Sequence, residues 1–190
     1  MESDSCELSE VYNEFIKVKK RVEENNSSSL SLSQNEKSIV KLIEHRINKV
    51  ITPTHHACYL LDPRHQGENL KSEEEDNAID LIKLIWKHLN NVDMELNSEQ
   101  ESSIISDIIN FKARSGPFES RSSWTAINSI KNNFITAANW WKGNFKNKSV
   151  LTDVAEVLLT LPSSTAWSVW GNIHSIMDYN YGLKKDFDRF

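Results

Sequence analysis

Apolar side chains recur at three- and four-residue intervals along most of this chain, which is the spacing of one face of an α-helix. The first such stretch covers residues 7–24, and a polar run over residues 25–33 follows it as a linker. Residues 33–36 (Ser-Gln-Asn-Glu) then form a capping-box pattern, in which two side chains bond free backbone amides at a helix start. We expect the helix that follows to end at Pro53, because proline disfavours helical conformation in the preceding residue.

Two further capping-box patterns, at residues 72–75 and 98–101, precede isoleucine-rich stretches and predict two more helices. Residues 115–117 (Ser-Gly-Pro) predict a turn. Weaker periodicity over residues 118–148 predicts two short helices, joined by the polar residues 131–133.

The C-terminal part of the chain predicts two more helices. Ser149 can cap a helix that carries apolar residues as far as Leu161, and Pro162 should end it. A last helix is expected to reach Ile176.

No strand pattern appears, so the predicted fold is all-α: a single helical domain of about six to eight helices. A chain of 190 residues with 38% hydrophobic content can bury one core. The expected organisation is an N-terminal helix and linker over residues 1–33, a helical domain over 34–177, and a tail over 178–190.

Charge is distributed unevenly along the chain. The net charge of −5 argues against a mainly electrostatic nucleic-acid binder. Residues 68–101 hold 10 acids against 3 lysines, whereas residues 111–149 hold 7 basic residues against 1 acid. Acids in a first helical turn are favoured by the helix dipole, which explains part of the acidic excess. The two segments are also candidates to face one another, within or between subunits.

The only cysteines, Cys6 and Cys58, lie far apart, so neither a disulfide framework nor a zinc ribbon is implied. No segment approaches the ~20 apolar residues of a membrane span, and no N-terminal signal is seen. We expect an intracellular protein in a reducing compartment, with no membrane partner.

Five potential metal ligands lie within residues 55–65: His55, His56, Cys58, Asp62 and His65. The His-x-x-Cys spacing suits a soft divalent metal, but a closed zinc site normally recruits a second ligand pair elsewhere. Packing or surface histidines are therefore the favoured interpretation. No nucleophile elbow or glycine-rich phosphate loop occurs, so we expect no catalytic residues, no metal, no cofactor and no small-molecule substrate.

Two segments resemble the hAT superfamily of transposases. Residues 53–64 (Pro-Thr-His-His-Ala-Cys-Tyr-Leu-Leu-Asp-Pro-Arg) are similar to a structural segment of that family, with Asp-Pro as a helix stop. The C-terminal order Asn-Trp-Trp-Lys, Leu-rich helix, Pro-Ser-Ser and Trp-Ser…Ile-His-Ser, over residues 139–175, is similar to the family's C-terminal block.

The resemblance also implies that catalysis has been lost. In the family, a stretch containing the last catalytic glutamate precedes the Trp-Ser pair, whereas here Ala166 is joined directly to Trp167. The family's other two catalytic acids lie on ribonuclease-H-like strands, and this chain shows no strand pattern. We therefore expect no enzyme activity.

In the family the C-terminal block supports subunit association. The resemblance thus implies a transposase-derived dimerisation module in the nucleus, paired with a second copy or with related transposase-like proteins. Seven residues are expected in its core or dimer surface: Trp140, Trp141, Leu151, Val154, Leu158, Trp167 and Trp170.

Two alternatives remain open at this point. One is a vestigial product without activity. The other is a DNA-binding fragment that uses the basic, aromatic stretch 111–149. Its contacts would be Lys112, Arg114, Arg121, Lys142, Lys146 and Lys148.

Overall fold

The computed structural model describes residues 7–28, 41–42, 45, 49–92 and 94–161. Its helices are α1 (Leu8–Ser28), α3 (Pro53–Leu61), α4 (Ser72–Leu89), α5 (Ser98–Ala113), a 3-10 turn η1 (Gly116–Phe118), α6 (Arg121–Thr125), α7 (Ile127–Lys131), α8 (Ala137–Phe145) and α9 (Thr152–Leu159). Among these described residues no strand forms, which confirms the predicted all-α fold of six to eight helices. Among the described helices, none combines the length and the apolar composition that a membrane span requires.

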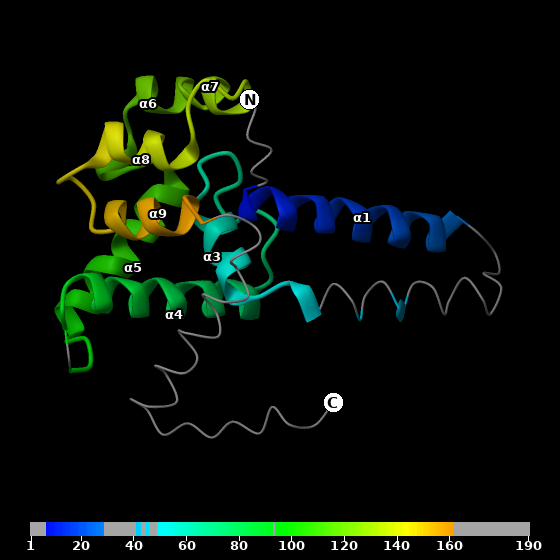
Figure 1. The fold of residues 1–190 in the computed structure, drawn as a ribbon, viewed down its shortest axis with the longest axis horizontal. Helices are drawn as coiled ribbons and strands as arrows, with labels where there is room; N and C mark the ends of the chain where they lie inside the picture. The colour runs from blue at the N-terminus through cyan, green and yellow to red at the C-terminus, as the bar shows by residue number, and fades with distance from the viewer. Residues whose placement is uncertain (1–6, 29–40, 43–44, 46–48, 93, 162–190) are drawn as a thin grey trace.

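The body of the molecule is built around α3 (Figure 1). Every residue of α3 after Pro53 is buried, as expected for a helix enclosed on all sides. Pro53 occupies the first turn, where a missing N–H costs nothing. The helix ends at Leu61 because Asp62 is extended and Pro63 follows, so the Asp-Pro stop is present in the structure.

In Figure 1, α6, α7 and α8 lie at the top of the body, α4 lies at the bottom, and α9, α3 and α5 lie between. The helix α1 packs by its N-terminal half against α3, and its C-terminal half extends away from the body.

The two predicted serine caps were each wrong by one residue, since Lys71 and Asn97 hold the N-cap positions of α4 and α5. The Asn97 side chain accepts from the amide of Gln100 at 2.9 Å, and the Gln100 side chain accepts from the amide of Asn97 at 3.1 Å. Asparagine caps a helix as well as serine does. With Asn97 as the N-cap of α5, Gln100 occupies position N3 and completes the capping box. At α4, Glu74 accepts from the amide of Lys71 at 2.8 Å.

Other predicted boundaries need correction as well. Helix α1 continues to Ser28, through the start of the predicted linker. Three helices, α6 to α8, replace the two expected over residues 118–148. Ser149 does not cap the helix that follows it. Its hydroxyl donates to the Asp107 carboxylate at 2.7 Å, and α9 begins at Thr152, with Leu151 at the N-cap position.

Most of the helix predicted after residue 33, the helix predicted to reach Ile176 and the tail lie outside the described residues.

An aromatic cluster fills the core between α5, η1 and α8. Its members are each at most 1% exposed: Phe111, Phe118, Trp140, Trp141 and Phe145. Their ring centroids lie 4.7 to 6.3 Å apart, mostly in tilted or edge-to-face pairs. Helix α9 packs against α8 and α3, and joins this cluster to the α3 core.

Candidate functional site

The structure places five of the predicted dimerisation residues in the core of a single copy. Each is at most 1% exposed: Trp140, Trp141, Leu151, Val154 and Leu158. Their side chains are therefore not part of an outer surface. Trp167 and Trp170 lie outside the described residues.

The two segments that carry the family resemblance pack directly against each other. The indole nitrogen of Trp141 donates to the carbonyl of Leu61 at 2.8 Å, and the Cys58 thiol donates to the carbonyl of Leu158 at 3.3 Å. Burial raises the pKa of the Cys58 thiol, and the nearby Asp62 carboxylate adds to the effect. A buried thiol of this kind is inert rather than nucleophilic.

The residues predicted to contact nucleic acid lie at the surface. Several of them are engaged within the chain. Lys112 pairs with Glu75, and Lys142 pairs with Glu156 at 3.1 Å. The Arg114 guanidinium lies over the ring of Trp124, 4.5 Å from its centroid.

The remaining three predicted contacts differ from one another. Lys148 donates to the carbonyl of Asn144 at 3.1 Å. Arg121 and Lys146 are exposed and form no ion pair with the described residues.

The aromatic side chains of this basic stretch are mostly unavailable to stack on bases. Phe111, Phe118, Trp140, Trp141 and Phe145 are buried, and Trp124 is half-buried. Phe134 is the exception, because its side chain is 79% exposed. A base-stacking platform built from several aromatics is thus absent from the described part of the chain.

Of the five predicted metal ligands, Asp62 and His65 lie close together, but His55, His56 and Cys58 do not join them. His55 Nδ1 lies 3.0 Å from Thr52 Oγ1, and the Thr52 amide donates to it at 3.2 Å. Burial lowers the pKa of His55 to about 4. Burial also lowers the pKa of His56, whose ring nitrogens bond none of the described residues. The Cys58 thiol is turned toward α9, where it bonds the Leu158 carbonyl.

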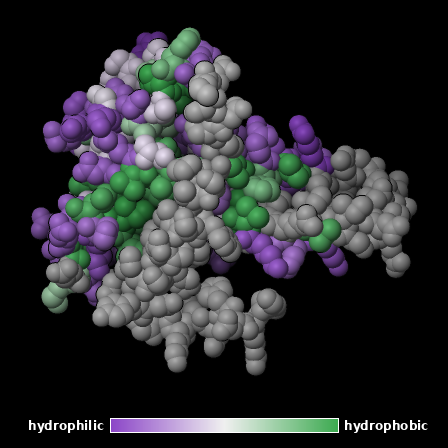
Figure 2. All heavy atoms as spheres, in the orientation of Figure 1, coloured by the Kyte–Doolittle hydropathy of each residue, from purple (hydrophilic) through white to green (hydrophobic). Residues whose placement is uncertain are grey.

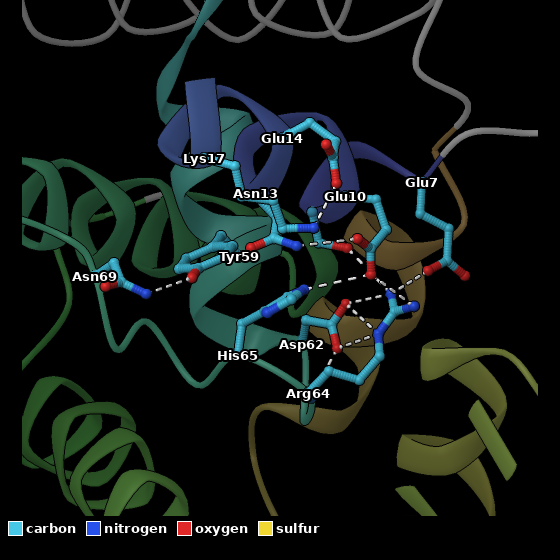
Figure 3. Close-up of polar contacts among 11 residues, drawn as sticks. Glu7, Glu10, Asn13, Glu14, Lys17, Tyr59, Asp62, Arg64, His65 and Asn69 are labelled. Atoms are coloured by element: carbon cyan, nitrogen blue, oxygen red, sulfur yellow. Dashed lines mark hydrogen bonds and ion pairs between the residues drawn. The ribbon is translucent and has the colours of Figure 1, made fainter. Parts of the chain in front are cut away.

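A polar cluster at the junction of α1 and α3 was not foreseen from the sequence (Figure 3). Arg64 lies at its centre, with a side chain only 9% exposed. Its guanidinium bonds Asp62 through Nε at 2.9 Å, Glu10 through Nη1 at 2.9 Å, and also Glu7. Burial lowers the pKa of Arg64, but the bonds to Asp62 together with the charges of Asp62, Glu7 and Glu10 outweigh this effect and raise the pKa above its ordinary value.

His65 completes the cluster. Its ring stacks on Tyr59 with centroids 4.6 Å apart, and its Nε2 lies 3.4 Å from Glu10 Oε1. The hydrogen bond from His65 and the charge of Arg64 lower the pKa of Glu10 to about 2, although burial opposes them.

Ligand atoms of Glu10, Asp62 and His65 all lie within 4.8 Å of one another, which is close enough for a metal ion. The Arg64 guanidinium already bonds both carboxylates, so a cation would have to displace a buried arginine. The cluster therefore fits a tie between α1 and the end of α3 better than a metal site. Asp62 and Arg64 are adjacent to Pro63 in sequence, but nothing in the sequence identified their partners on α1.

An open groove of about 580 Å³ lies between α1 and α4. Tyr12 lies along this groove and donates to Glu74 at 3.0 Å, so a hydrogen bond joins the two helices there. The described residues place no nucleophile, base and orienting acid together in this groove or in the polar cluster.

Comparison of the chain with protein-family models, with curated proteins and with solved structures finds no match. The hAT resemblance stays a prediction.

Proposed function

We propose that this chain is a non-catalytic self-association module, derived from an hAT-type transposase. The observation that supports self-association is the placement of opposite charges at opposite ends of the body. The hAT origin, and the nuclear location that it implies, rest on the sequence resemblance.

The basic end is formed by α6, α7 and α8. Arg121 on α6, Lys131 on α7 and Lys146 after α8 are exposed and have no ion pair among the described residues. Figure 1 shows these helices together at the top of the body.

The acidic end is formed by α4 and the start of α5. Glu73, Asp76 and Asp80 are exposed and recur at helical spacing along one side of α4. Glu95 and Glu99 add exposed carboxylates before and within the first turn of α5. The helix α4 lies at the bottom of the body in Figure 1.

Only one ion pair, Lys112 with Glu75, joins the acidic segment 68–101 to the basic segment 111–149 within the described residues. The intramolecular version of the charge hypothesis therefore accounts for little of the charge. The other exposed charged side chains of the two segments can orient a second copy, because complementary surface charges steer two molecules together and fix their relative orientation.

An apolar area lies between the two charged ends on the face drawn in Figure 2. Hydrophilic side chains gather at the upper left and lower left of that face, with apolar side chains over α9 and α5 between them; a smaller apolar group lies at the top. A two-fold contact would bring the acidic end of each copy to the basic end of the other and pair the apolar areas. An apolar centre with a charged rim is the usual anatomy of such an interface.

Light scattering coupled to size-exclusion chromatography tests this proposal across protein concentration and salt. We expect a dimer at about 0.1 M salt that weakens toward about 1 M salt, as the Debye length falls from about 10 to about 3 Å. A compact monomer at every concentration and salt would contradict the proposal.

Charge reversal supplies the matched control. An Asp76→Lys, Asp80→Lys variant and an Arg121→Glu, Lys131→Glu variant should each remain monomeric, whereas their mixture should associate. Binding of a random-sequence DNA duplex by the unaltered chain, lost steeply with added salt, would instead favour the DNA-binding alternative.

A further inference from the structure

Phe134 is the most exposed large aromatic side chain in the described part of the chain, at 79%. It lies on the short link between α7 and α8, where Asn133 takes a left-handed conformation with φ +58°. The amide of Phe134 donates to Ser129 at 2.9 Å, and that of Asn133 donates to Ile130 at 2.9 Å. These bonds hold the backbone of the turn, which presents the ring to solvent.

Single exposed apolar residues are common on protein surfaces, so exposure alone decides nothing. Phe134 differs because its turn is fixed and because it follows Lys131 on the basic end. An exposed aromatic beside a cation is the composition of an interface anchor.

A hollow of about 270 Å³ lies at the acidic end, between α4 and the start of α5. Two half-buried leucines, Leu84 and Leu96, supply its apolar lining. Its volume is below the range of about 300 to 1,000 Å³ that small-molecule sites occupy, so it suits a side chain better than a ligand. Met94, 79% exposed, precedes the lining residue Glu95.

Three acids and two lysines line this hollow: Asp80, Glu95, Glu101, Lys83 and Lys87. Lys83 is held by Glu101 and lies 3.9 Å from Asp80. The balance is one negative charge, and Glu95 is exposed at the edge, where a cation from a partner can reach it.

We propose that Phe134 of one copy inserts into the hollow between Leu84 and Leu96 of a second copy, with Lys131 facing Glu95. The inference rests on the proposed self-association and names the contact that anchors it. In a two-fold arrangement each copy supplies one ring and one hollow, so the dimer contains the contact twice. The opposite ends of the body that carry the ring and the hollow are the ends that the charge pattern brings together.

The variant Phe134→Ala tests the contact. Because an anchor costs about 2 kcal/mol or more when truncated, and each of the two contacts is lost, the dimer dissociation constant should rise by at least about 700-fold. Val18→Ala is the matched control, since Val18 is 38% exposed on α1, which contributes to neither charged end, nor the hollow, nor the apolar area over α5 and α9. It should change the dissociation constant by less than about threefold.

A charge exchange provides a second, independent measurement. Lys131→Glu and Glu95→Lys should each weaken the dimer, and the double variant should recover affinity because the pair is restored with reversed sign. Both residues are exposed, so the fold should tolerate the changes.

The outcomes separate the inference from the function on which it rests. A wild-type chain that stays monomeric overturns both. A wild-type dimer whose affinity is unchanged by Phe134→Ala overturns the inference alone. Loss of affinity with Phe134→Ala, retention with Val18→Ala and recovery in the double variant support it.

Discussion

The indole nitrogen of Trp141 donates a hydrogen bond to the backbone carbonyl of Leu61, 2.8 Å away and 80 residues earlier in the chain. Leu61 is the last residue of α3, so its carbonyl is one of those that a helix leaves without an intrahelical partner. Both residues are fully buried. The bond therefore satisfies a buried acceptor and ties α8 to α3.

Two substitutions of Trp141 should separate packing from hydrogen bonding. Trp141→Ala should lower the free energy of unfolding by about 3 to 5 kcal/mol, because it leaves a large cavity. Trp141→Phe keeps most of the ring and should cost about 1 to 3 kcal/mol, because the Leu61 carbonyl is left unsatisfied. Urea denaturation measures both changes. At protein concentrations below the dimer dissociation constant, Phe134→Ala removes only an exposed ring and should change the free energy of unfolding by less than about 0.5 kcal/mol. A monomeric Trp141→Ala of unchanged stability would contradict the core assignment.

Arg64→Ala should be strongly destabilising, by about 3 to 5 kcal/mol, because it leaves the fully buried Asp62 carboxylate without its partner. Arg64→Lys should recover only part of the loss, since an ammonium cannot bond Asp62, Glu10 and Glu7 with the same planar geometry. Lys142→Ala removes an exposed pair with Glu156 and should cost at most about 1 kcal/mol. Equal effects of Arg64→Ala and Lys142→Ala on thermal unfolding would argue against the polar cluster as a structural tie.

Helix type and rough position could be predicted from the sequence because periodicity and capping patterns are local. The precise starts of α4 and α5 could not be predicted from the sequence. Lys71 and Asn97 precede serines that could equally occupy the N-cap position, and the choice depends on how each helix packs in the folded chain. The extra helix within residues 118–148 also escaped prediction, because α6 and α7 are five residues each and too short to show a period.

Features of the candidate sites that depend on residue type could also be predicted, whereas features that depend on contacts between distant segments could not. The burial of Trp140 and Trp141 is consistent with their size and apolar character, which the sequence shows directly. The partners of Arg64 could not be predicted, because Glu7 and Glu10 lie more than 50 residues earlier and no pattern links them to it. The exposure of Phe134 was likewise hidden, since it depends on the turn at Asn133 rather than on residue type.

Acidification should destabilise the fold in two pH ranges. Burial lowers the pKa of His55 from 6.5 to about 4. Between those values the unfolded chain binds a proton that the folded chain does not, so the free energy of unfolding decreases as the pH is lowered. The bond from His65 and the charge of Arg64 lower the pKa of Glu10 from 4.5 to about 2, so a second loss follows as pH falls through that range.

Urea midpoints measured across both ranges check this dependence on pH. His55→Gln should reduce the slope in the upper range but not abolish it, because glutamine at N3 can still accept from the Thr52 amide without titrating, while burial also lowers the pKa of His56. Glu10→Gln should flatten the lower range only. A wild-type midpoint that stays constant from pH 6.5 to about 4 would contradict the neutral, buried state of His55.

The same substitution at two glycines should change stability in opposite directions. Gly67 has φ +70°, and a Cβ there would lie 2.7 Å from Leu60 Cδ1, so Gly67→Ala should cost about 1 to 3 kcal/mol. Gly143 lies on the exposed side of α8, where a Cβ would meet no neighbouring atom within 4 Å, so Gly143→Ala should add about 0.5 to 1 kcal/mol through helix propensity. Both changes are measured from the midpoint of urea unfolding at an unchanged slope. Because the chemical change is identical, only the backbone conformation and the neighbouring atoms can produce opposite signs, and two shifts of the same sign would mean that the turn after α3 or the helix α8 is formed differently.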